Sequence, residues 1–251
     1  ESPMCRASLN EPAVRPSLLA LLAILQSRAA PTDALALRLR AKVLLLLGFC
    51  LYDGKLLPQL LGASLVEHAL ALLEPTAAVE LDPEAEPPEP PSGEALQCAA
   101  ELKSNAATVV AIAGQSAAGR EAIVAAGGLT TLVKALSPPA AGADGEPPPP
   151  AATDQAAAAL MANVTLALAH AALSGAAAVC LAGQPEIVPL LASILAPSPE
   201  GAVPGWSAVR GNACTALLHI VHQPAGRLAF LAAPAALAPG EAAPEGEEEA
   251  T

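Results

Sequence analysis

The chain has 251 residues, a formal net charge of −12 and 53% hydrophobic residues, but aromatic side chains make up only 2%. A core without aromatics must come from Ala, Leu and Val, which suits closely packed helices, and the alternating β-branched and aromatic runs typical of strands are absent. The acidic balance, with no basic cluster interleaved with aromatics, argues against nucleic-acid binding. The composition therefore predicts an all-α protein.

The first helix is predicted close to the amino-terminal end. Residues 1–16 are polar and interrupted by prolines, so we expect them to fray. Residues 17–28 are rich in leucine, and Ser17 is a suitable N-cap directly after a proline. We therefore predict a helix over residues 17–28.

Two further helices are predicted before residue 74. Thr32 or Asp33 caps a longer helix that runs to about Leu51. Gly54 breaks that pattern, and the leucine-rich segment 58–73 predicts one last helix before the composition changes.

The clearest helical pattern of the chain lies at residues 102–138. Glycines divide it into three predicted helices, at 102–113, 119–126 and 129–136. None of these can bury its apolar face alone, so the unit needs neighbours of its own kind. Three other segments have the same internal layout: residues 39–75, 160–197 and 209–239.

The four segments can be aligned position by position along their longer helix. The aligned position holds Lys42, Asn105, Asn163 and Asn212. Five residues further on, where we expect burial between units, the segments hold Leu47, Val110, Leu168 and Leu217. A glycine follows each longer helix: Gly54, Gly119, Gly175 and Gly226. Self-similarity of this kind is typical of a solenoid.

Short motifs in the second and fourth segments resemble armadillo repeats. The motifs are Asn105-Ala106-Ala107 with Asn212-Ala213-Cys214, Gly119-Arg120 with Gly226-Arg227, and the corner Ala126-Gly127-Gly128. The resemblance covers residues 35–75 and 95–237. It implies a right-handed armadillo/HEAT-like solenoid of about four three-helix units, with disordered insertions rich in proline and glutamate.

The predicted organisation follows these units and the segments between them. In order it is a frayed segment 1–16, the first helices and repeat 17–73, an acidic proline-rich linker 74–94, a second repeat 95–137, a proline-rich loop 138–152, a third repeat 153–196, a loop 197–205, a fourth repeat 206–238 and an acidic tail 239–251.

Extended capture of basic peptides is not supported by the aligned positions. Armadillo domains that bind such peptides use an asparagine ladder, which should fall seven residues after the aligned position. Those places hold Phe49, Ile112, His170 and His219. The aligned asparagines themselves are therefore expected to be structural, either as caps or as hydrogen bonds across neighbouring units.

No organised catalytic or metal-binding group is present in the sequence. His219 and His222 are three residues apart with Cys214 nearby, which is too few ligands for a zinc site. No phosphate-binding loop, nucleophile motif or paired cysteine motif occurs. We therefore predict a non-enzyme without cofactor or metal, with thiols buried in helices.

The longest uncharged apolar stretch, residues 156–173, raises the question of a membrane span. It contains Asn163, Thr165 and His170, and half of it is alanine. We expect a buried helix rather than a span. The lack of a cysteine framework favours a reducing, cytoplasmic location.

Two groups of residues are candidates for partner binding. Arg38, Arg40 and Lys42 form either a solvated helix face or a patch for an acidic partner, such as a tubulin-like surface or an acidic tail. A second group, near the other end of the chain, comprises His170, Arg210 and His219.

A second resemblance concerns residues 37–61, LRLRAKVLLLLGFCLYDGKLLPQLL. This stretch is similar to helical repeats in the non-catalytic part of Fused-type kinases, some of which act at motile cilia. The leading hypothesis is a non-catalytic interaction scaffold in a larger, cytoskeletal or ciliary (axonemal) assembly. Two alternatives are the regulatory repeat region of a larger enzyme such as a Fused-like kinase, and a soluble enzyme with an unrecognised site.

Overall fold

The computed structural model describes residues 15–26, 33–52, 55–74, 92–137, 154–196 and 202–232. Within these ranges every regular element is a helix and none is a strand, which confirms the all-α prediction. Most of the predicted frayed segment, linker, loops and tail lie outside the described residues, as does the expected third helix of the fourth unit.

Twelve helices are described. Their bounds are α2 (Arg15–Gln26), α3 (Ala34–Cys50), α4 (Leu57–Gly62), α5 (Leu65–Leu73), α6 (Gly93–Gly114), α7 (Ala117–Ala125), α8 (Gly128–Leu136), α9 (Gln155–Ala172), α10 (Gly175–Ala182), α11 (Ile187–Leu195), α12 (Trp206–Val221) and α13 (Pro224–Ala232).

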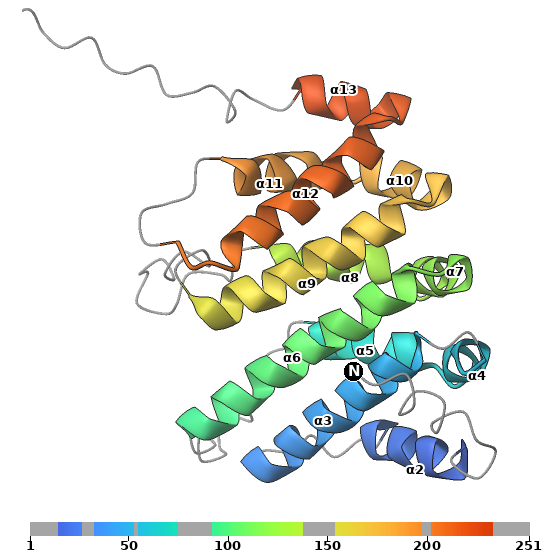
Figure 1. Cartoon of the computed structure of the whole chain (residues 1–251). Helices are drawn as coiled ribbons and strands as arrows, with labels where there is room; N and C mark the ends of the chain where they lie inside the picture. Colours follow the sequence, from blue (N-terminus) through green and yellow to red (C-terminus); the bar gives the residue numbers. More distant parts are fainter. Residues whose placement is uncertain are drawn as a thin grey trace, which may run out of the picture.

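Four long helices, α3, α6, α9 and α12, lie side by side in chain order, and we call them the long-helix row (Figure 1). Shorter helices pack against the row in a regular order: α5 on α6, α8 on α9, and α11 on α12. Helix α2 packs on α3 in the same relation. The described part of the fold therefore consists of a row of long helices with shorter helices packed against it.

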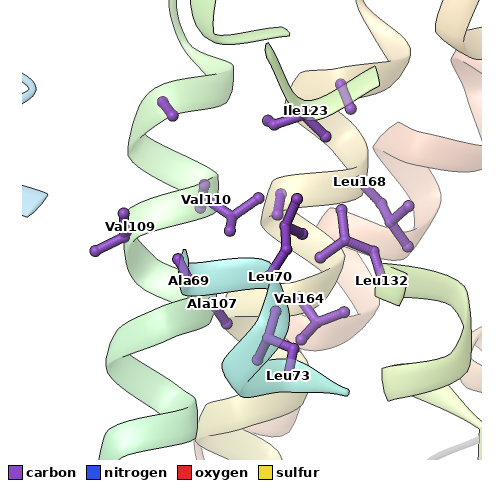
Figure 2. Close-up of a cluster of buried hydrophobic side chains, with 14 of the residues drawn as sticks. Ala69, Leu70, Leu73, Ala107, Val109, Val110, Ile123, Leu132, Val164 and Leu168 are labelled. Atoms are coloured by element: carbon purple, nitrogen blue, oxygen red, sulfur yellow. The ribbon is translucent and has the colours of Figure 1, made fainter. Parts of the chain in front are cut away.

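The core lies between the long-helix row and the shorter helices. Val110, Leu168 and Leu217, which the alignment predicted to be buried, are 0%, 0% and 7% exposed, so that prediction is confirmed. Figure 2 shows side chains from α5, α6, α7, α8 and α9 meeting in one cluster, with Leu70 of α5 among them. Burial of each helix therefore depends on its neighbours in the series.

Small residues let neighbouring long helices approach closely. A Cβ placed on Gly48 of α3 would lie 2.8 Å from Val109 Cγ2 of α6. One placed on Gly114 of α6 would lie 2.9 Å from the Cβ of His170 in α9. These separations are too short for real side chains, so both sites require glycine.

Helix α9 combines length and apolarity with burial. It is the one described helix long and apolar enough by itself to span a bilayer, and α10 with α11 passes the same test only as a pair bent by 94°. Helix α9 packs against α6, α8 and α12. Of its residues 44% are buried, and these contribute to helix packing, so the expected burial holds for part of the helix.

Helix starts agree with the sequence at Asp33 and differ at two other places. Asp33 caps α3, since its carboxylate accepts from Leu35 N (3.2 Å) and Ala36 N (3.1 Å). Helix α2 begins at Arg15, so Ser17 lies inside the helix and is not its N-cap.

Helix α6 begins earlier than predicted. It starts at Gly93 because Ser92 Oγ accepts from Ala95 N (3.2 Å), with Glu94 favourably placed in the first turn. The residue pattern had placed this helix at 102–113 and Glu94 in the linker. Both expectations were wrong. The run of prolines directly before the cap made the start of this helix resemble the linker.

The segment 58–73, predicted as one helix, forms two. Helix α4 ends at Gly62 and α5 begins at Leu65, because Ser64 adopts a left-handed conformation with φ 60°. Gly127 occupies the corresponding corner between α7 and α8, with φ 69°. The first helix set thus has the same three-helix order as the second.

We expect exchange of residue types at these two corners to change stability in opposite directions. A left-handed serine is strained by about 1–2 kcal/mol, so Ser64→Gly should raise the free energy of unfolding by up to about 1 kcal/mol after the entropy of glycine is subtracted. Gly127→Ser should lower it by a similar amount, since a Cβ there meets nothing within 4 Å and only φ is at issue. Urea denaturation followed by circular dichroism measures both changes in the free energy of unfolding. If both variants were stabilised, or both destabilised, the left-handed conformation at the two corners would be contradicted.

Candidate interaction surfaces

The aligned asparagines form hydrogen bonds between consecutive long helices. Each side-chain amide donates to a backbone carbonyl of the preceding long helix. The bonds are Asn105 Nδ2 to Ala41 O (2.9 Å), Asn163 Nδ2 to Ser104 O (3.3 Å) and to Ser104 Oγ (3.2 Å), and Asn212 Nδ2 to Ala162 O (3.0 Å).

These bonds have one register throughout the row. Every acceptor is the residue directly before the aligned position of the preceding helix: Ala41 before Lys42, Ser104 before Asn105, and Ala162 before Asn163. The expectation of a hydrogen bond across neighbouring units is therefore confirmed for all three asparagines.

His170, a predicted partner-binding residue, takes part in the same packing. Its Nδ1 lies 2.7 Å from Ala111 O of α6, so Nδ1 carries the proton and donates. The side chain is half-buried, and its Cβ faces Gly114. His170 therefore contacts the neighbouring helix, and much of its ring is removed from the surface.

Arg210 and His219 lie at opposite ends of α12. Arg210 is half-buried, and its Nη2 donates to Leu195 O (3.1 Å) in the last turn of α11. His219 is half-buried in the last turn of α12. Nine residues of helix separate them by about 13 Å along the axis. His170 and His219 thus lie near the carboxyl ends of two neighbouring long helices, α9 and α12, whereas Arg210 lies toward the amino end of α12.

The basic residues of α3 are ion-paired with α6. Arg38 Nη2 lies 2.8 Å from Glu94 Oε1, and Lys42 Nζ lies 2.5 Å from Glu101 Oε1. The basic side chains are 50% and 62% exposed, so they remain accessible to solvent. Solvent screens both pairs, so each contributes little to stability.

The surroundings of Arg38 favour its charged form. A hydrogen bond with the Cys98 side chain, followed by the charge of Glu94, raises the pKa of Arg38. Arg40, the third member of the group, is half-buried. The acidic partners were missed in the sequence because Glu94 was assigned to the linker; the Ser92 cap would have placed both glutamates on α6.

The Gly-Arg motifs have a structural role that the sequence did not disclose. Arg120 Nη1 donates to Gly114 O (3.0 Å) and Gln115 O (3.1 Å) at the end of α6. Arg227 Nη1 donates to His222 O (3.1 Å) at the end of α12. Both guanidinium groups therefore cap helix carbonyls that have no partner within the helix.

The adjacent glycines permit this turn. A Cβ on Gly119 or on Gly226 would clash with a carbonyl oxygen at the end of the preceding long helix, Ala113 O and Ile220 O respectively. Helix α7 therefore packs directly on the last turn of α6, and α13 on the last turn of α12.

The thiols and titratable groups form no metal cluster in the described part of the chain, where no three His, Cys, Asp or Glu side chains group together. Cys50 and Cys98 are buried, as predicted for helical thiols. Cys180 and Cys214 are exposed, so the prediction of burial was wrong for these two.

Comparison with known proteins identifies no relative: no protein-family model and no curated protein matches this chain. The resemblances to armadillo repeats and to Fused-type kinases therefore depend on the quoted residues alone.

We expect the asparagine bonds to contribute measurably to stability. Asn163→Asp keeps the size of the side chain but removes the donor and places a carboxylate beside Ser104 O, so the free energy of unfolding should fall by about 1–3 kcal/mol at neutral pH. Gln97→Glu makes the same chemical change on the exposed surface of α6 and should alter it by less than about 0.5 kcal/mol. If urea denaturation gave the same change in the free energy of unfolding for both variants, the Asn163 bond would contribute nothing beyond an exposed amide.

Proposed function

We propose that this chain is a non-catalytic protein-interaction scaffold built as an armadillo/HEAT-like solenoid. Its units are α3–α5, α6–α8, α9–α11 and a fourth unit that starts with α12 and α13. The handedness expected for such repeats is right-handed. The assignment to a cytoskeletal or ciliary assembly depends on the resemblance of residues 37–61 and forms the least specific part of the proposal.

The observation that carries the proposal is the single register of the asparagine bonds. Three consecutive interfaces of the row use the same donor position and the same acceptor position. Units that stack by one repeated rule generate an extended surface on which equivalent positions recur, and such surfaces bind other proteins.

The partner that fits the exposed charges best is acidic. Arg38, Arg40 and Lys42 lie on α3, and the counter-charges Glu94 and Glu101 come from α6. Because the two ion pairs are exposed and weak, an acidic segment of a partner can displace the glutamates at small cost. A flexible acidic tail, such as that of a tubulin-like surface, has this chemistry.

Binding of a fluorescent polyglutamate peptide, measured by anisotropy, tests the proposal. Glu94→Gln with Glu101→Gln should free the basic side chains and strengthen binding several-fold. The matched control is Glu121→Gln with Glu186→Gln, which makes the same change in net charge at exposed residues of other helices. Lys42→Glu should weaken binding, whereas Lys134→Glu on α8 should not.

The salt dependence and the controls decide the outcome. Binding should weaken as salt brings the screening length below about 8 Å. Equal effects of the two glutamate pairs, or of Lys42→Glu and Lys134→Glu, would mean that only the net charge of the chain matters. The acidic-partner proposal would then fail.

A further inference from the structure

The outer side of α3 carries an apolar stripe at helical spacing. Leu35, Leu39 and Leu46 are 72%, 52% and 38% exposed, and Lys42 lies between them. We call these four residues the α3 face. These leucines and Lys42 occupy positions at which a long helix inside the row contacts the long helix before it.

The corresponding residues of α6 are covered by α3. Counted from the aligned position, they are Cys98, Leu102, Asn105 and Val109. The three apolar members are at most 5% exposed. Val109 packs on Gly48, and Asn105 bonds to Ala41. The α3 face is thus the side of a long helix that normally lies against the long helix before it.

The outer side of α12 shows the opposite half of the same contact. Gly211, Cys214 and Leu218 are exposed, Leu218 by 53%, and we call them the α12 face. The corresponding residues of α9 are Ala162, Thr165 and Ala169. There, Ala162 O accepts the Asn212 bond, and Thr165 and Ala169 are 0% and 3% exposed.

The described residues contain no long helix before α3 or after α12 (Figure 1). Helix α2 packs on α3 and on α5, in the manner of a shorter helix, and the α3 face stays exposed. Both ends of the long-helix row therefore expose positions whose equivalents inside the row are mostly buried or half-buried, Ala156 of α9 being exposed.

We propose that the α12 face of one copy receives the α3 face of a second copy, so that the row continues from one molecule into the next. This inference deepens the scaffold proposal and depends on the repeat register described there. The occupant is a second copy because the two faces are the two halves of one contact that the chain already makes three times. A larger apolar face with a donor enters a face that offers Gly211, Cys214 and a backbone carbonyl, Gly211 O, which accepts at present from Thr215 Oγ1.

The register assigns specific contacts to this interface. Lys42 stands where the other long helices have asparagine, so its ammonium would donate to Gly211 O, the equivalent of the three known acceptors. Gly211 O accepts from Thr215 Oγ1 (3.0 Å), and Ser104 O shows that such a carbonyl can take a second donor, since it accepts from Thr108 Oγ1 and from Asn163 Nδ2 together. Lys42 must first leave Glu101, an exposed pair of little energetic weight.

The contact is head-to-tail, and such contacts make open assemblies rather than closed dimers. Sedimentation velocity of the full chain should show an average mass that grows with concentration. Leu39→Glu blocks the α3 face and Leu218→Glu blocks the α12 face, so each variant alone should be monomeric at concentrations where the unmodified chain is associated. A mixture of the two variants should form one-to-one dimers and nothing larger, since one intact face of each kind remains.

Leu173→Glu is the matched control. Leu173 is 52% exposed at the end of α9 and lies outside both faces, so this variant should associate like the unmodified chain. Leu35→Glu, at the most exposed position of the α3 face, replaces Leu39→Glu if circular dichroism shows that the latter is unfolded. At protein concentrations where the unmodified chain is monomeric, polyglutamate binding by Leu218→Glu should be unchanged, which separates failure of this inference from failure of the acidic-partner proposal.

Four results would overturn the inference. The unmodified chain stays monomeric at every concentration. It associates only after removal of residues 233–251, which would show that the tail covers the α12 face. The mixture of blocked variants stays monomeric, which would show that the intact α3 face and the intact α12 face do not bind each other. The face variants associate as strongly as Leu173→Glu, which would place the contact elsewhere.

Discussion

The amide-to-carbonyl bond between consecutive long helices fixes the arrangement of the whole chain. Small residues such as Gly48 and Gly114 allow the long helices to approach closely, and faces of small residues pack almost equally well in several registers. A half-buried amide has one satisfactory position, since an unpaired polar group away from water costs about 1–3 kcal/mol. The backbone carbonyl of the preceding helix supplies that position at each interface. Apolar burial therefore supplies most of the stability, and the asparagines select the register.

Local sequence was sufficient wherever one residue decides one structural feature. Asp33 caps α3, and Gly127 turns the chain between α7 and α8, as their chemistry predicts. Ser64 was missed because serine seldom adopts a left-handed conformation, and only its place in the three-helix set requires it. The start of α6 was missed because the preceding prolines concealed the Ser92 cap. Secondary structure was thus predictable except where neighbouring helices override local preference.

The candidate surfaces were harder to predict because contacts between distant segments decide them. Glu94 and Arg38 are far apart in sequence, and only the packing of α6 on α3 joins them. His170 has the residue type of a binding site, yet its ring serves the contact with α6. Cys214 is exposed although its counterparts in the other long helices are buried, and this difference reflects the position of α12 in the row. Residue type alone therefore does not distinguish a side chain at the surface from one that takes part in helix packing.

Because aromatic residues are scarce, the chain has one tryptophan and one tyrosine that can report on opposite ends of the long-helix row. Its single tryptophan, Trp206, is 8% exposed at the first residue of α12, and its single tyrosine, Tyr52, is 46% exposed just after α3. Indole emission therefore follows solvent entry around α12, while far-ultraviolet dichroism averages over every helix. In a series of units stabilised by nearest neighbours, loss of an end unit precedes global unfolding. Fraying that begins at α12 will thus shift the fluorescence transition to lower denaturant than the dichroism transition, whereas fraying from α3 will leave the tryptophan signal until last.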